Sequence, residues 1–147
     1  MTASAATARA FVLDASVTAT WLFDDEADPV LDALLRALLP GQAVVPALWH
    51  LETANLLAQG ERRGRITAAQ IPERRTLLAA LRVETDTTAP ERGLGPILDL
   101  ARRHRLSAYD AAYLDLALRC ALPLASKDAA LRRVAQAEGV ALLPAEG

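Results

Sequence analysis

The sequence has one cysteine and few aromatic residues. Cys120 is the single cysteine, so no disulfide can form within the chain, and the disulfide-stabilised scaffolds of secreted proteins are excluded. Aromatic residues make up 4% of the chain, whereas hydrophobic residues make up 52% and are mostly Ala and Leu. This composition favours tightly packed helices over an all-β sandwich. It is also typical of a globular protein rather than a disordered one.

Long apolar runs are absent as well. No stretch of about 20 uncharged apolar residues occurs, so we expect no segment that crosses a membrane. Residues 1–9 are small and polar with no long apolar run behind them, and we expect them to form a flexible leader rather than a signal peptide. The remaining residues, 10–147, suffice for one ordinary domain. These features predict a single cytoplasmic domain.

The chain has no excess of positive charge, and several common catalytic motifs are missing. Its formal net charge is −2, so no global field favours a polyanionic partner, although carboxylates that bind a metal ion would themselves make this sum more negative. Neither a G-x-x-x-x-G-K-[ST] loop nor a G-x-G-x-x-G loop occurs, and there is no G-x-S-x-G motif. His50 and His104 lack the spacing of zinc ligands. Nucleotide binding of those kinds, serine hydrolysis and zinc chemistry therefore have no support.

The chain does contain a regular alternation of short apolar runs and segments with helical spacing. The apolar runs are typical of strands buried on both faces, and they are residues 10–13, 43–45, 81–85, 123–125 and 140–143. The predicted helices are residues 16–23, 30–39, 48–59, 67–80, 90–104, 107–120 and 128–138. Gly60 is expected to end the third helix, and a basic turn, 61–65, follows it. The alternation predicts an α/β fold with a parallel sheet covered by helices on both faces.

Three aspartates fall where strands end and helices begin. Asp14 follows the first strand, Asp128 follows the fourth, and Asp110 lies in the first turn of a helix. In an open α/β sheet, binding sites lie outside the carboxyl ends of the strands. Each aspartate also has a simpler interpretation: Asp14 and Asp128 as N-caps, and Asp110 as part of a capping box with Ser107. Helical periodicity favours a site for Asp110, because it shares an apolar face with Tyr113, where an unpaired carboxylate is costly.

A fourth acid, Glu52, lies in the middle of a predicted helix, where capping cannot explain it. It forms a polar stripe with Asn55 and Gln59, and this stripe is either a solvated face or one wall of a cleft. Asp115 instead lies on the far side of its helix, four residues before Arg119, and is predicted to form a surface ion pair outside the site. Several carboxylates without paired Cys or His ligands indicate a hard cation, Mg²⁺ or Mn²⁺.

Four segments that contain these acids resemble a known family, the PIN domain, and specifically the VapC-type toxin ribonucleases of toxin–antitoxin pairs. The segments, in chain order, are 12–17 (VLDASV), 45–46 (VP) with 52–57 (ETANLL), 106–114 (LSAYDAAYL) and 124–131 (LASKDAAL). Each is a weak signal alone, but four in this order cover nearly the whole chain. The resemblance implies a three-layer α/β fold, with a central parallel sheet flanked by helices.

The resemblance also implies roles for the matching residues. The catalytic carboxylates that bind Mg²⁺, for which Mn²⁺ can substitute, would be Asp14, Glu52, Asp110 and Asp128. The residues that orient carboxylates or metal-bound water would be Ser16, Asn55 and Ser126. The family more often has threonine at the position of Ser126, and serine keeps the hydroxyl.

The activity implied is a Mg²⁺-dependent endoribonuclease that hydrolyses RNA phosphodiester bonds to 5′-phosphate and 3′-hydroxyl products. Arginines are the candidates for RNA binding, since the planar guanidinium suits phosphate; the alternative is a set of solvated surface arginines. The candidates are Arg62, Arg63 and Arg65 of the basic turn, which we favour, then Arg74 and Arg75, and then Arg102, Arg103 and Arg105. The partners implied are the RNA substrate, a cognate antitoxin protein that lies across the active-site groove, and a second copy of the chain in a homodimer.

Three alternatives differ in the motifs that they require. The first is a PIN-like module that binds RNA or protein without catalysis, and the presence of all four acids argues against it. A receiver-like phosphoacceptor domain would need adjacent acids near the end of the first strand, whereas Leu13 precedes Asp14. A phosphatase of the haloacid dehalogenase type would need an Asp-x-Asp motif, whereas Ala15 and Ser16 follow Asp14.

Overall fold

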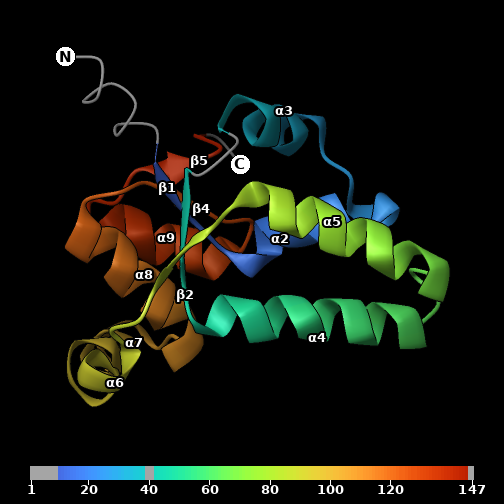
Figure 1. Cartoon of the computed structure of the whole chain (residues 1–147). Coiled ribbons are helices and arrows are strands. Elements are labelled where there is room, and N and C mark those ends of the chain that lie inside the picture. Colours follow the sequence, from blue (N-terminus) through green and yellow to red (C-terminus); the bar gives the residue numbers. More distant parts are fainter. Residues whose placement is uncertain (1–9, 39–41, 146–147) are drawn as a thin grey trace.

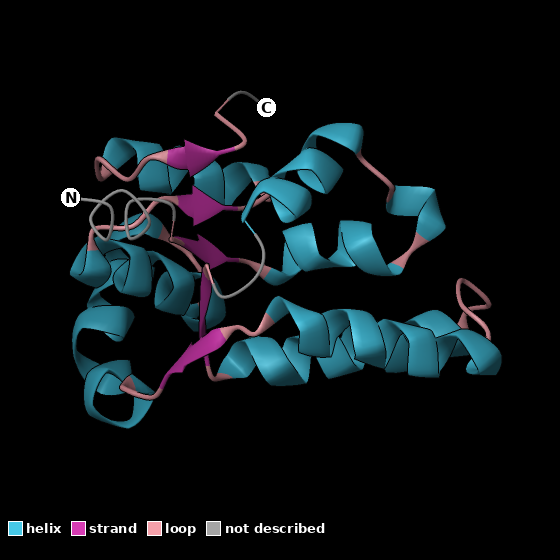
Figure 2. Cartoon of the chain, turned by 45° about the horizontal axis from the view of Figure 1, so that its top comes forward, coloured by secondary structure: helices cyan, strands magenta, loops and turns pink. Residues whose placement is uncertain are grey.

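The computed structural model describes residues 10–38 and 42–145, so the predicted leader at 1–9 lies outside the described residues. The fold has three layers, with a five-stranded parallel sheet between two layers of helices, as predicted (Figures 1 and 2). The strands are β1 (Phe11–Leu13), β2 (Ala43–Pro46), β3 (Glu84–Asp86), β4 (Leu124–Ala125) and β5 (Leu142–Leu143). Their order across the sheet is β3-β2-β1-β4-β5.

The strand order places a topological switch between β1 and β4. The chain adds β2 and β3 on one side of β1, then crosses back and adds β4 and β5 on the other side. Leu13 pairs with Ala125 in parallel register, so the residues that follow, Asp14 and Ser126, leave the sheet next to each other. Ligands of open α/β sheets bind at such switch points, outside the carboxyl ends of the strands.

Eight α-helices enclose the sheet in the described part of the chain. One layer contains α2 (Ala15–Leu22), α3 (Pro29–Leu38), α4 (Leu48–Arg62) and α5 (Ile71–Leu81). The other contains α6 (Ala89–Arg92), α7 (Leu98–His104), α8 (Ala108–Cys120) and α9 (Ala129–Ala137). The three residues of β1 are buried and pack in the main core, which explains their continuous apolar pattern. No helix in residues 10–38 and 42–145 has the length and apolar character needed to cross a membrane.

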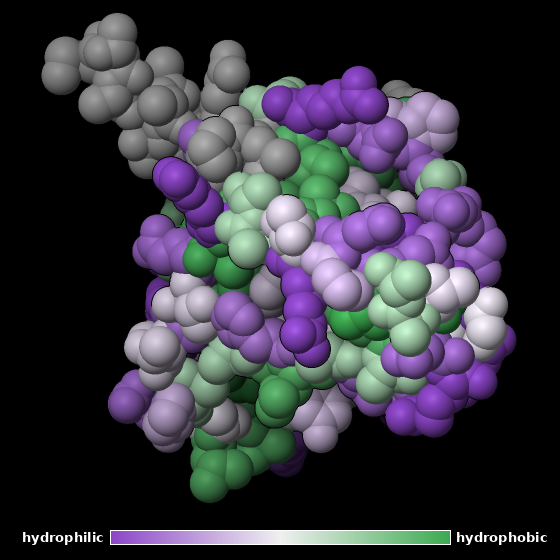
Figure 3. All heavy atoms as spheres, turned by 45° about the vertical axis from the view of Figure 1, so that its right-hand side comes forward, coloured by the Kyte–Doolittle hydropathy of each residue, from purple (hydrophilic) through white to green (hydrophobic). Residues whose placement is uncertain are grey.

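The hairpin of α4 and α5 projects from the domain, and its packing corrects the prediction for Gly60. This residue does not end a helix: α4 continues to Arg62, and the turn follows at Gly64, whose φ is +74°. Gly60 is buried against the ring of Phe23, so that a Cβ at this position would lie 2.4 Å from Phe23 Cε1. The absence of a side chain at Gly60 therefore allows α4 to pack closely against the end of α2. Figure 3 shows hydrophilic side chains over most of the end of the molecule where this hairpin projects.

Two other predicted elements were wrong in their extent. The apolar run at 81–85 is not one strand, because Leu81 still belongs to α5 and Arg82 ends that helix in the left-handed conformation (φ 51°). The strand that follows, β3, lies at the edge of the sheet and is largely exposed. The predicted helix 90–104 is interrupted between α6 and α7, where Gly95 leaves the helical region and Pro96 cannot donate a backbone hydrogen bond.

Candidate active site

Asp14 is the most buried of the four predicted acids. It leaves the carboxyl end of β1, is 5% exposed, and occupies the N-cap position of α2 without a capping hydrogen bond from its side chain. The capping interpretation is therefore wrong for this residue. Its carboxylate oxygen Oδ2 instead accepts hydrogen bonds from Ser16 Oγ (2.7 Å) and Ser126 Oγ (2.8 Å). Burial raises the pKa of Asp14, and these two hydroxyls oppose that rise.

The two serine hydroxyls also fix the ends of β1 and β4 to each other. Ser16 Oγ accepts a hydrogen bond from the backbone N–H of Lys127 (2.9 Å), and Ser126 Oγ accepts one from the backbone N–H of Asp128 (3.0 Å). A hydroxyl has one proton to donate, and in both serines this proton is directed to Asp14. The serines therefore hold the Asp14 carboxylate and the loop after β4 in one arrangement.

Glu52 faces the same end of the sheet from α4, and its partner is a residue that the sequence analysis assigned no role. Tyr113 of α8 is fully buried, and its hydroxyl donates a 2.6 Å hydrogen bond to Glu52 Oε1. Burial raises the pKa of Glu52, the hydrogen bond from Tyr113 lowers it, and the charges of Asp14 and Asp110 raise it. The helical periodicity that places Tyr113 on the face of Asp110 is the signal that points to this contact.

Asp110 and Asp128 lie at the beginnings of α8 and α9. Ser107 caps α8 by accepting a hydrogen bond from the backbone N–H of Asp110 (3.0 Å), so one half of the predicted capping box is present. Asp128 is the N-cap of α9, and its Oδ1 accepts a hydrogen bond from the backbone N–H of Leu131 (2.9 Å), which confirms the capping interpretation for this residue. Capping uses one oxygen of Asp128 and leaves Oδ2 for another contact.

Neighbouring carboxylates help to raise the pKa values of Asp14, Glu52 and Asp110. In the described residues, no basic side chain forms an ion pair with any of the four. Burial and then the charges of Asp128 and Asp14 raise the pKa of Asp110 to about 6. Like charges that are brought together in this way raise one another's pKa values, and a bound cation reverses the effect.

The donor set fits a divalent cation. Within residues 10–38 and 42–145, no three acids are already close enough to form a complete metal-binding cluster. Direct contact with every acid is not required, because Mg²⁺ commonly binds through one or two carboxylates and keeps several waters. The oxygen donors and their uncompensated negative charge suit Mg²⁺ or Mn²⁺ rather than zinc.

Two of the four acids, Glu52 and Asp128, line a groove that is large enough for part of a polymeric substrate. This groove has a volume of about 420 Å³. Its polar lining comes from Ser16, Glu26, Glu52, Asn55, Lys127 and Asp128. Asn55 is exposed one turn after Glu52, and these two residues of the predicted stripe line the groove, whereas Gln59 does not. Of the residues predicted to bind metal or to orient its ligands, four line this groove, namely Ser16, Glu52, Asn55 and Asp128, and three do not, namely Asp14, Asp110 and Ser126.

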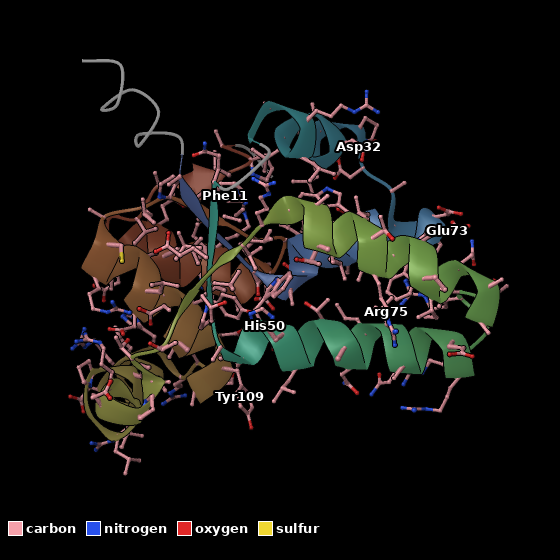
Figure 4. All side chains as sticks on the ribbon, viewed as in Figure 1. Phe11, Asp32, His50, Glu73, Arg75 and Tyr109 are labelled. Atoms are coloured by element: carbon pink, nitrogen blue, oxygen red, sulfur yellow. The ribbon has the colours of Figure 1, made fainter. Side chains whose placement is uncertain are left out.

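A separate hollow of about 470 Å³ lies on the opposite side of α4, between α4 and α5. Its lining includes His50, Thr53 and Arg75; Figure 4 shows His50 at the start of α4 and Arg75 projecting from α5. The hydroxyl of Thr53 is buried and has no hydrogen-bond partner in the described part of the chain. None of the four acids lines this hollow, so it is distinct from the acid groove.

The structure separates the three arginines of the predicted RNA-binding turn. Arg62 and Arg63 are exposed at the far end of α4. Arg65 instead binds Asp25 through two hydrogen bonds (2.9 and 3.1 Å) and Glu26 (2.5 Å), with its guanidinium 4.0 Å from the centre of the Phe23 ring. Arg65 thus stabilises the packing of the hairpin on α2, and its charge is compensated.

Asp115 lies outside the four acids, as predicted, but it is not a surface residue. It is 4% exposed, and Arg92 of α6 binds both of its carboxylate oxygens (2.7 and 2.8 Å). The predicted contact with Arg119 is present at 3.7 Å and is the weaker of the two. The error arises because residues 93–104 pack against α8 and bring Arg92 to Asp115, which the periodicity of α8 alone does not reveal.

Comparisons with known proteins agree with this fold. A family model for the PIN domain matches residues 11–137. Among solved structures, the crystal structure of PAE2754 from Pyrobaculum aerophilum is similar, with a TM-score of 0.65 and 23% sequence identity over 92% of this chain and 91% of that chain. No curated protein matches the sequence.

Proposed function

Since the chain belongs to the PIN-domain family, whose members are typically metal-dependent nucleases, we propose that it is a Mg²⁺-dependent endoribonuclease. The proposed products of RNA hydrolysis carry a 5′-phosphate and a 3′-hydroxyl. We further propose that the protein is a VapC-type toxin of a toxin–antitoxin pair. The observation that carries the proposal is the convergence of Asp14, Glu52, Asp110 and Asp128 at the switch point of the sheet, with no ion pair to compensate them in the described residues.

In this proposal, the four acids hold the metal ion, and the neighbouring hydroxyls position the acids. A divalent cation would supply a water of lowered pKa and would neutralise charge on the scissile phosphate. Ser16 and Ser126 hold Asp14 through Oδ2, and Tyr113 holds Glu52 through Oε1. These contacts fix the donor atoms before the ion arrives, so that less ordering is required on binding. Asn55 lines the groove beside Glu52 and is proposed to contact a water or the substrate.

The direct test is cleavage of total cellular RNA by the purified protein with Mg²⁺, with Mn²⁺ and with EDTA. Asp14→Asn and Asp110→Asn should abolish cleavage, because each removes a negative ligand. Asp32→Asn is the matched control, since Asp32 is an exposed acid of α3 far from the groove (Figure 4). We expect discrete fragments that require metal, disappear in both site variants and persist in the control.

The competing function is a PIN-like module that binds RNA or protein without cutting it. One observation favours this alternative, namely that Asp128 uses a carboxylate oxygen to cap α9. Absence of cleavage by folded protein free of antitoxin, over a range of metal concentrations, would establish the binding module instead. The fold assignment would be unaffected.

We propose two protein partners for the toxin, an antitoxin that covers the acid groove and a second copy of the chain. Large exposed apolar side chains suit the second contact: Leu51 is 77% exposed, Leu94 90% and Tyr109 65%. Burial of such side chains is a common source of free energy for association. Light scattering after size-exclusion chromatography tests the dimer, and a monomer at micromolar concentration would contradict it.

A further inference from the structure

A second hollow adjoins the acid groove, and the two share Lys127. This hollow has a volume of about 320 Å³ and lies over α9 and the end of β5. Three basic side chains line it, Lys127, Arg132 and Arg133, together with Gln136 and apolar atoms. No acid contributes to its lining within the described residues, whereas three acids line the neighbouring groove. The charge of the lining therefore changes from negative in the acid groove to positive in this hollow, and Lys127 lies at the border.

From this change of sign, and building on the proposed ribonuclease activity, we propose that the RNA strand leaves the acid groove across Lys127 and continues over α9. Its phosphates would bind Lys127, Arg132 and Arg133. The backbone N–H of Lys127 donates to Ser16 Oγ, so the residue is anchored at the border of the acid site while its side chain stays exposed. A phosphate held there would lie beside the carboxylates without having to face them.

The charge of Arg132 is fixed in place without being neutralised. Its guanidinium donates hydrogen bonds to three backbone carbonyls, those of Ser126 (2.8 Å), Leu143 (3.4 Å) and Pro144 (2.9 Å). Carbonyl oxygens orient the side chain but leave its full positive charge for a ligand. In the part of the chain that the structure describes, none of Lys127, Arg132 and Arg133 forms an ion pair with an acid.

This surface is a better site for an RNA strand than the basic turn at 61–65 is. Arg62 lies ten residues beyond Glu52 on α4. At a rise of 1.5 Å per residue it is therefore about 15 Å from Glu52 along the helix. Arg65 is already bound by Asp25 and Glu26. Lys127, by contrast, precedes Asp128 directly and lines the same groove. Substrate next to four carboxylates needs nearby cations, because the acids repel phosphate.

The test measures binding of a single-stranded RNA oligonucleotide by fluorescence anisotropy over a range of salt concentrations. Asp14→Asn serves as the parent, so that RNA is not cut during the measurement. Each phosphate contact to single-stranded nucleic acid contributes about 0.7 to the slope of log K against log salt concentration. The double variant Lys127→Ala/Arg133→Ala should therefore lower the slope by about 1.4. Arg132 is left intact because it also binds three carbonyls.

The matched control is Arg36→Ala/Arg102→Ala, which removes the same charge from two exposed arginines on α3 and α7. The control should keep the slope of the parent. An equal slope in the parent and the Lys127/Arg133 variant, or no RNA binding by the parent, would overturn the inference. A lower slope in a protein that never cuts RNA would support the phosphate track and refute the nuclease, so the two failures are distinguishable. Thermal unfolding of each variant reports its folding.

Discussion

The hydroxyl of Tyr113 donates a 2.6 Å hydrogen bond to Glu52 Oε1 across the interface of α8 and α4. Tyr113 is fully buried, and burial together with Glu52 raises its pKa, so the phenol remains protonated and can only donate to the carboxylate. Glu52 is thus oriented by a residue on the helix that begins with Asp110. One contact links the positions of two acids that are 58 residues apart in sequence.

Tyr113→Phe should weaken metal binding without unfolding the protein. The change removes the hydrogen bond and keeps the ring in the core. Loss of such an orienting contact typically costs 10–100-fold in metal affinity or activity, and we expect a loss of about 10-fold in Mn²⁺ affinity by calorimetry. Because the hydrogen bond lowers the pKa of Glu52, its loss should also move the acid limb of the cleavage profile to higher pH. An unchanged Mn²⁺ affinity and pH profile would show that Tyr113 only packs.

Because the acids repel one another, the metal-free wild type should be less stable than the metal-free Asp110→Asn variant. With EDTA at pH 8, Asp110→Asn should raise the free energy of unfolding by up to about 1 kcal/mol, a small value because a half-exposed charge is screened. Mg²⁺ should then raise the Tm of the wild type more than that of the variant, since a ligand stabilises the state that binds it. Asp32→Asn should change neither quantity. A lower stability of Asp110→Asn in EDTA would contradict the repulsion.

The same repulsion predicts how the stability of the metal-free protein depends on pH. The pKa of Asp110 is about 6 in the folded state and near 3.8 when it is unperturbed. A raised pKa means that the folded state binds this proton more tightly than the unfolded state does. Its contribution is complete below about pH 3.8 and is lost as the pH rises through about 6. Urea unfolding of wild type and Asp110→Asn in EDTA should therefore diverge as the pH rises from 4 to 7.

The positions of three acids at strand ends and helix starts could be predicted from local pattern, whereas the position of Glu52 in the middle of a helix could not. Asp14 and Asp128 come directly after short apolar strands, and Asp110 interrupts the apolar face of a helix. The order of the strands in the sheet was harder to predict from the sequence. Residues 10–13 and 123–125 become neighbours only because the chain crosses the sheet before β4. The contact between Asp14 and Ser126 depends on that crossing.

The parts that sequence reasoning missed involve contacts between distant elements. Gly60 has the local signature of a helix end, but its role is set by the ring of Phe23 on another helix. The sequence places Arg119 four residues after Asp115, yet the shorter contact of Asp115 is with Arg92 of α6. A periodicity argument treats each helix alone and cannot reveal which neighbour covers it.

The basic turn offers a prediction that separates structural arginines from RNA-binding ones. Arg65→Gln should lower the Tm, because it removes ion pairs to Asp25 and Glu26 and the contact with the Phe23 ring. Arg62→Ala/Arg63→Ala should leave the Tm unchanged, because both residues are exposed in the turn region. If the turn binds RNA, as its arginines suggest from sequence, the second variant should also lower the salt slope of RNA binding. An Arg65 variant as stable as the wild type would contradict its structural role.

Gly60→Ala should destabilise the protein even though alanine is the better helix former. A methyl group at this position would lie 2.4 Å from Phe23 Cε1 and 2.7 Å from Cζ, while the guanidinium of Arg65 lies against the same ring. Phe23 is 2% exposed and has little room to move, so the overpacking should cost about 1–3 kcal/mol. The higher helix propensity of alanine offsets at most about 1 kcal/mol of this destabilisation.

Gly93→Ala provides the matched comparison for this effect. Gly93 has helical dihedral angles (φ −58°, ψ −52°), and a Cβ there would meet nothing within 4 Å. Alanine should therefore stabilise the protein by about 0.5–1 kcal/mol through reduced chain entropy. Urea unfolding of both variants should give shifts of opposite sign. Equal shifts would mean that Phe23 yields to the methyl group.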